Sequence, residues 1–258
     1  MLIDIHQIEF FVLVFIRIAA AFAVLPLFSH SATPTMVKAG LAGAIALLLV
    51  PTLSGTLPPP SGTILDFLLL ASRETVCGIL LGLAGQFLFY GVDVAGQLLG
   101  FQAGFSVVSS IDPNTESQST VITQVYNLVV MLVFLAIDGH HAMLKAICDS
   151  FHQIPVGQLV VDGRFSQWML AGVQTVMVDG IRLAAPLMVT LLLTDVGLGI
   201  LTRVAPTMNV FVIGFPLKVS ITLIMLSMTL GVVASIFSTQ YMDYVHQIPS
   251  FLKLLSRP

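Results

Sequence analysis

Long apolar segments recur along the whole chain, and they constrain its fold more than any other feature. Six of them approach the ~20 residues that a helix needs to cross ~30 Å of hydrocarbon. Proline, glycine and polar residues separate them. The segments are Ile8 to Phe28, Ala39 to Leu53, Phe67 to Phe101, Val121 to Ile137, Trp168 to Leu193 and Val210 to Phe237. The pattern predicts an all-α fold of helical hairpins associated with a membrane.

Composition excludes several classes of protein. Hydrophobic residues make up 57% of the chain and charged residues 9%, whereas soluble domains carry about 25% charged residues. Only ten Lys and Arg residues are present, and the net charge is -3. No basic patch is therefore available to neutralise the phosphates of a nucleic acid.

Some of the apolar segments are too long for a simple membrane span. No proline occurs between Pro60 and Pro113, so the third segment predicts a helix of ~35 residues, or ~52 Å. A hairpin turned at its glycines is the alternative. The stretch between Pro216 and Pro249 is also longer than a bilayer requires.

Several charged residues lie inside or beside the apolar segments. A lipid-facing charge would cost at least ~2.5 kcal/mol, so these side chains are expected to face protein or water. We predict polar contacts between helices or between subunits for Arg73, Glu74, Asp93, Asp179, Arg182, Arg203 and Lys218. Asp179 and Arg182 are three residues apart and can pair on one helix face, which favours local neutralisation over a proton relay.

The glycines of the third segment follow a spacing typical of close helix packing. Gly78, Gly82 and Gly85 form one group, and Gly96, Gly100 and Gly104 form a second at four-residue intervals. Small residues at this spacing let two helix backbones approach closely in a membrane. The face that carries the second group is expected to be a buried seam between helices or the wall of a lumen.

A polar island, Gly104 to Thr120, interrupts the apolar chain with the sequence GFSVVSSIDPNTESQST. Its glycine, its proline and its many hydroxyl groups predict a hydrated, non-helical segment. A second irregular stretch runs from Asp195 to Lys218 and contains Pro206 and Pro216, which predict broken helices.

No reaction chemistry is evident from the sequence. The patterns HExxH, GxSxG, GxxxxGK[ST] and CxxC are absent. His140 and His141 follow Asp138 and Gly139, where a short turn explains them and a metal would need a third ligand. We expect neither an enzyme nor a cofactor nor a bound metal.

Three stretches resemble the R subunit of the flagellar type III export gate, the FliR family. They are GFSVVSSIDP (104–113), FLAIDGHHAMLKAICDSFHQIPVG (134–157) and LTRVAPTMNVFVIGFPLK (201–218). The resemblance covers essentially the whole chain, and its specificity lies in the combination of motifs.

The resemblance implies a single-copy subunit that co-assembles into a helical, cone-shaped export gate. Residues 1–172, including the loop 104–120, would resemble a P subunit in fold, and residues 173–258 would form a hairpin similar to a Q subunit. The implied partners are the P and Q subunits (FliP and FliQ), the export-switch subunit FlhB, FlhA, the rod base, and unfolded substrates in transit. The implied location is the bacterial inner membrane within the flagellar basal body, with much of the gate on the periplasmic side.

The resemblance also implies that the loop after the long helix plugs the closed channel. The matching residues here are Phe105, Ser106, Val107, Val108, Ser109, Ser110, Ile111, Asp112, Pro113 and Asn114. Apolar residues in this loop can seat against a constriction, and the serines keep it wettable when it is displaced.

Two alternatives remain open at this stage. One is the equivalent T subunit of a virulence injectisome. The other is a secondary transporter, in which broken helices around Pro206 to Pro216 and the intramembrane Asp93, Asp179 and Arg182 would form a site at the middle of the membrane.

Overall fold

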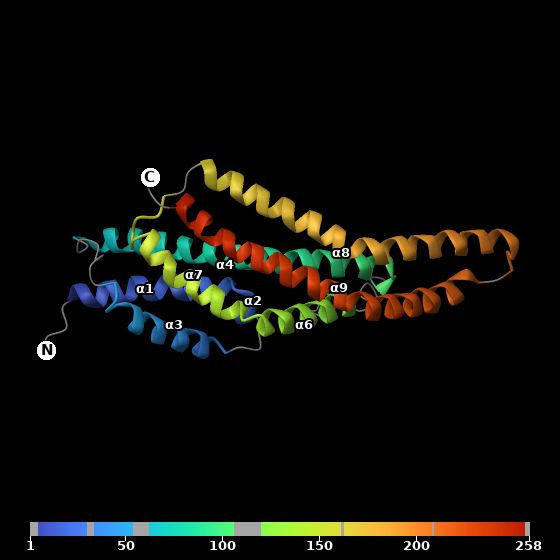
Figure 1. The fold of residues 1–258 in the computed structure, drawn as a ribbon, viewed down its shortest axis with the longest axis horizontal. Coiled ribbons are helices and arrows are strands. Elements are labelled where there is room, and N and C mark those ends of the chain that lie inside the picture. The colour runs from blue at the N-terminus through green and yellow to red at the C-terminus, as the bar shows by residue number, and fades with distance from the viewer. Residues whose placement is uncertain are drawn as a thin grey trace. The chain divides into compact units, whose positions relative to one another are not determined.

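All regular structure in the described part of the chain is helical, which confirms the all-α prediction. The computed structural model describes residues 5–29, 34–53, 62–105, 120–160, 163–207 and 209–255. The helices are α1 (Ile5–Val24), α2 (Pro26–Ser29), α3 (Thr35–Leu49), α4 (Ile64–Gln102), α6 (Val121–Ala136), α7 (Gly139–Gln153), α8 (Gly163–Val204) and α9 (Val210–Leu255) (Figure 1).

Four of these helices are long and apolar enough to cross a membrane: α1, α4, α8 and α9. Helices α6 and α7 meet at a 68° bend and raise the number to five if they act as one broken span. Not all of the six apolar segments are therefore membrane spans. Helix α3, with 15 residues, is too short, and the fourth apolar segment ends at the bend after α6.

Helix α4 confirms the overlong helix and excludes the hairpin alternative. It continues for 39 residues, or about 59 Å at 1.5 Å per residue. Helices α8 and α9 contain 42 and 46 residues. Each of the three is longer than a bilayer requires.

The break predicted around Pro206 to Pro216 is shorter than expected. Pro206 lies in a turn between α8 and α9, but α9 begins at Val210 and continues through Pro216. Proline removes only one backbone hydrogen bond, here the one that would reach the carbonyl of Val212, and the flanking residues keep the helical conformation. Pro186 lies inside α8 in the same way.

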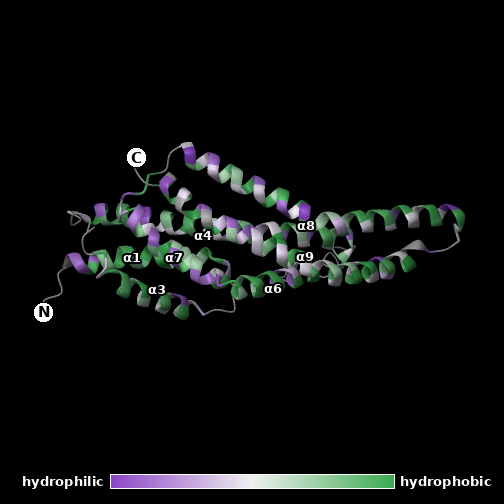
Figure 2. Cartoon of the chain, viewed as in Figure 1, coloured by the Kyte–Doolittle hydropathy of each residue, from purple (hydrophilic) through white to green (hydrophobic). Residues whose placement is uncertain are grey.

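The chain divides into two compact units, and each contains segments that are distant in sequence. The first unit comprises Met1–Phe87, Asp138–Gly172 and Tyr241–Pro258, and the second comprises Leu88–Ile137 and Val173–Gln240. Hydrophobic residues occur along all of the labelled helices (Figure 2). These units are defined by contacts within the chain and do not test the predicted resemblance of residues 1–172 to a P subunit and of residues 173–258 to a Q subunit. That resemblance stays a prediction.

Close helix contacts at glycines hold the first unit together. A Cβ added to Gly78 would lie 2.3 Å from the Arg17 carbonyl oxygen of α1, and one added to Gly82 would lie 2.6 Å from Val24 Cβ. The prediction of close approach from glycine spacing is confirmed here. An aromatic stack adds to this core, with the Trp168 ring centroid 4.0 Å from that of Phe251.

The second unit uses the same device between α4 and α6. A Cβ on Gly96 would lie 2.6 Å from Thr123 Cα, and a Cβ on Gly100 would lie 2.3 Å from Thr120 Cγ2. Phe89 packs edge-on against Phe134 and Phe237, with centroids 5.4 and 5.2 Å away. Of the two readings left open for this glycine face, the structure supports a buried seam.

Candidate functional site

The polar island begins where α4 ends at a glycine. Gly104 has φ +89°, a conformation that L side chains rarely adopt, so glycine is required to turn the chain out of the helix. Its N–H donates to the Phe101 carbonyl at 3.1 Å. The next residue, Phe105, packs edge-on against Phe215 of α9, with 6.5 Å between the ring centroids. The first residue of the predicted plug is thus seated on a neighbouring helix.

The island ends at Thr120, which caps α6. The Thr120 hydroxyl accepts a hydrogen bond from the Thr123 N–H at 3.3 Å and donates to the Gly96 carbonyl of α4 at 3.3 Å. Such an N-cap contributes about 1 kcal/mol to helix stability. The island therefore begins two residues after the end of α4, and its last residue contacts Gly96 of α4, about two helical turns before Gly104.

The remaining predicted plug residues lie outside the described part of the chain. They are Ser106, Val107, Val108, Ser109, Ser110, Ile111, Asp112, Pro113 and Asn114.

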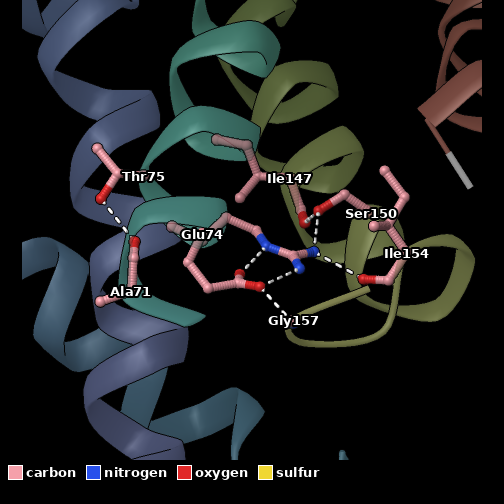
Figure 3. A network of polar contacts seen from close by, with 8 residues as sticks. Ala71, Glu74, Thr75, Ile147, Ser150, Ile154 and Gly157 are labelled. Carbon is pink, nitrogen blue, oxygen red and sulfur yellow. Dashed lines mark hydrogen bonds and ion pairs between the residues drawn. The ribbon is translucent and has the colours of Figure 1, made fainter. Parts of the chain in front are cut away.

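A buried ion pair joins two helices of the first unit (Figure 3). Arg17 of α1 and Glu74 of α4 are both fully buried, and the Arg17 Nη2 donates to Glu74 Oε1 at 3.1 Å. The Arg17 Nη1 donates to the Ile154 carbonyl at 3.0 Å and to the Ser150 hydroxyl at 3.3 Å. The pair thereby connects α1 and α4 to α7 and the turn that follows α7.

The turn that follows α7 also forms hydrogen bonds with the Glu74 carboxylate and with the neighbouring Arg73. The Gly157 N–H donates to Glu74 Oε1 at 2.7 Å, and the Gly157 carbonyl accepts from Arg73 Nη1 at 2.9 Å. The guanidinium of Arg17 also lies 4.2 Å from the centroid of the Phe151 ring, in cation–π contact. Arg73 and Glu74 are adjacent in sequence, and both contact this one turn.

Polar pairs in the second unit involve most of the other residues singled out from the sequence. Asn127 Nδ2 donates to Asp93 Oδ1 at 2.6 Å between α6 and α4. Lys218 of α9 pairs with Asp195 of α8, which also accepts from Gln102 of α4 at 3.1 Å. Asp195 thus joins three helices within this unit.

Asp179 and Arg182 form the local pair that their spacing predicted, with 3.8 Å between Arg182 Nη1 and Asp179 Oδ1. The arginine side chain is 73% exposed, so the pair contributes little to stability. Arg203 lies exposed in the last turn of α8. The structure does not gather the seven predicted contact residues into one site.

Sequence reasoning missed the partners of these charges. Ser150 and Ile154 are 133 and 137 residues from Arg17, and a single sequence carries no signal for such distant pairing. Asn127 was likewise not predicted as the partner of Asp93. The one usable signal was the Pro155 to Gly157 turn, because a glycine after a helix marks a chain reversal, and Gly157 has φ +79°.

Comparison with known proteins identifies the family. Residues 8–244 match the model of bacterial export proteins, family 1. The chain is 36% identical to the flagellar biosynthetic protein FliR of Bacillus subtilis (strain 168) over 86% of both chains, and 30% identical to that of Escherichia coli (strain K12) over 85% of this chain and 83% of the relative. The FliR of Aquifex aeolicus (strain VF5) is 26% identical over 95% of this chain and 94% of its own.

The chain belongs to family 1 of the bacterial export proteins, the family of flagellar FliR. Together with the four apolar helices, this membership makes it an integral membrane protein and a component of the flagellar export apparatus. The resemblance found in the sequence is confirmed at this level.

Proposed function

We propose that this protein is a non-enzymatic core subunit of the flagellar export gate, and that its polar island plugs the channel through which unfolded flagellar proteins pass. The family match supports the export role, and the flagellar names of its relatives favour it over a virulence injectisome. In this proposal, residues 1–172 correspond to a P subunit and residues 173–258 to a Q subunit.

The geometry of the island's two ends carries the plug proposal. Gly104 makes a left-handed turn directly after α4, and Thr120 contacts Gly96 and Gly100 of α4. A segment fixed at both ends on one rigid helix can be displaced by a passing chain and then return to the same place. Specific recognition is not needed, because an unfolded substrate offers no fixed shape.

We further propose that the protein acts with P and Q subunits, FlhB, FlhA and the rod base in the bacterial inner membrane, with much of the gate on the periplasmic side. Three helices longer than a bilayer requires support a position that is partly outside the hydrocarbon. The charged pairs inside the units, such as Asp195 with Lys218, also suit contact with protein rather than lipid.

The test is a leak measurement on the assembled gate. Deleting Ser106 to Ser117 is expected to raise the flux of ions or small solutes through complexes reconstituted in vesicles. A second variant replaces the same residues with a Gly/Ser segment of equal length, which keeps the reach between the two anchors but removes Val107, Val108 and Ile111.

The control is an equal-length Gly/Ser replacement of residues 54–61, another Pro- and Ser-rich segment of the chain. It is expected to leave the flux at the wild-type level. Normal assembly combined with wild-type flux in both island variants would show that the island does not form the seal.

A further inference from the structure

Three side chains with metal-ligand chemistry meet at the corner between α6 and α7. One carboxylate oxygen of Asp138 and one ring nitrogen each of His140 and His141 all lie within 4.8 Å of one another. His141 Nδ1 is 3.2 Å from Asp138 Oδ1, and the two imidazole centroids are 4.1 Å apart. The sequence alone left the histidine pair without a third ligand, and the structure supplies one in Asp138.

Packing within the first unit fixes this corner. The Gly139 carbonyl accepts a hydrogen bond from the buried Tyr241 hydroxyl of α9 at 2.8 Å. Asp138 has φ +56°, the only positive φ of a non-glycine residue in the part of the chain that the structure describes. The carboxylate and the two imidazoles are thus presented by a backbone that the surrounding helices hold in place.

His140 provides a separate observation. Its Nδ1 is buried and has no hydrogen-bond partner among the described residues. A buried polar atom without a partner costs about 1–3 kcal/mol. The hydrogen bond between Asp138 and His141 explains those two residues as an ordinary turn, but it leaves His140 unexplained.

We propose that Asp138, His140 and His141 bind a divalent first-row transition metal, with Zn²⁺ as the first choice. Imidazole ligands favour Zn²⁺ and its neighbours over Mg²⁺ or Ca²⁺, which prefer oxygen. Ligand atoms of a tetrahedral zinc are about 3.4 Å apart, given Zn–N and Zn–O distances near 2.1 Å. Binding therefore requires the exposed Asp138 and His141 side chains to rotate until the ligand atoms reach that spacing.

The site would be open rather than enclosed. The side chains of Asp138 and His141 are 74% and 70% exposed, so a metal can reach them from outside the protein. Three protein ligands leave a fourth position for water or for a ligand from a neighbouring molecule. A bound metal would fasten the first turn of α7 to the bend that precedes it, and this role is independent of the channel function proposed above.

The experiment titrates Co²⁺, a spectroscopic substitute for Zn²⁺, into the full-length, metal-free protein in detergent, and then displaces it with Zn²⁺. One equivalent is expected to bind with ligand-field bands of low coordination number. Asp138→Asn, which keeps a residue suited to positive φ, and His141→Gln are each expected to weaken binding at least about tenfold. His141→Cys should retain binding and add a thiolate-to-cobalt charge-transfer band.

The matched control is His152→Gln, which removes another exposed histidine of α7 and should bind as the wild type does. Equal weakening in His152→Gln, or wild-type binding in His141→Gln, would overturn the proposal and show only adventitious surface binding. Should Asp138→Asn fail to fold, the exposed His141 variants decide the outcome.

Discussion

At the scale of single residues, the Arg17–Glu74 pair shows how an apolar chain can contain a fully buried charge. Removing each ion from water costs several kcal/mol, and the mutual attraction offsets this only when the remaining donors and acceptors are also satisfied. Here the Ser150 hydroxyl and the Ile154 carbonyl accept hydrogen bonds from Nη1 of Arg17. The Gly157 N–H donates to the Glu74 carboxylate. Removing one charge of the pair is therefore expected to destabilise the protein far more than removing both charges together.

Glu74→Gln is expected to destabilise the protein strongly, by about 3–5 kcal/mol, because it leaves the buried Arg17 charge unpaired. The amide keeps the size of the side chain, so packing is not the cause. Thermal unfolding in detergent measures the effect. The double variant Arg17→Met with Glu74→Gln removes the unpaired charge and should recover a large part of the lost stability.

The exposed pair in α8 serves as the control for this prediction. Arg182→Gln breaks an ion pair whose arginine is 73% exposed, and we expect a change of no more than about 1 kcal/mol. Similar losses in Glu74→Gln and Arg182→Gln would contradict the argument that burial makes the difference.

At the scale of elements, α4 organises both units. Its first glycine group contacts α1, and its second contacts α6 next to the end of the polar island. A side chain at Gly96 would force a shift of the backbone, because a Cβ there would lie 2.6 Å from Thr123 Cα. Gly91, on the same helix, has its nearest neighbour at 3.6 Å, an ordinary contact.

These two glycines make a matched pair of variants. Alanine gains about 1 kcal/mol of helix propensity at either position, so the difference between them isolates the contact. Gly96→Ala is expected to be about 1–3 kcal/mol less stable than Gly91→Ala, because α6 must move away from α4. Equal melting temperatures for the two variants would show that the seam is loose.

The length of α4 and its close helix contacts could be predicted, because both depend on residue patterns that are local in the sequence. Glycine spacing indicated the close approach of α4 to its neighbours, and the absence of proline between Pro60 and Pro113 indicated its length. The sequence overestimated the break at Pro216, because the cost of one lost hydrogen bond does not decide whether apolar flanks continue a helix.

The partners of the buried charges could not be predicted from the sequence, because they are distant along the chain. Local rules relate residues three or four apart, and they correctly paired Asp179 with Arg182. The contact from Arg17 to Ile154 depends on how α7 and its turn fold back onto α1. Asp138 likewise became a candidate third metal ligand only once the structure placed its carboxylate near both histidine rings.

At the scale of the whole molecule, the apolar residues of α8 and α9 are mostly unburied. Only 22% of the most apolar stretch of α8 and 17% of that of α9 are buried, against 67% for α4. Large hydrophobic side chains such as Leu192, Leu193 and Val196 are more than half exposed. Lipid or partner subunits must cover these surfaces, because water would not support so large an apolar area.

Replacing Leu193 by Gln tests which of these covers the helix. Leu193 is 65% exposed, so the substitution is expected to change the protein's own unfolding free energy by about 0.5 kcal/mol or less. If partner subunits pack on this face, the unpaired amide will reduce the amount of P and Q subunits that co-purify with the protein. Thr202→Gln changes an exposed residue of α8 that is already polar and should leave co-purification unchanged. Wild-type yields for Leu193→Gln in a normally inserted protein would instead assign this face of α8 to lipid, and would confine the subunit contacts proposed here to other surfaces.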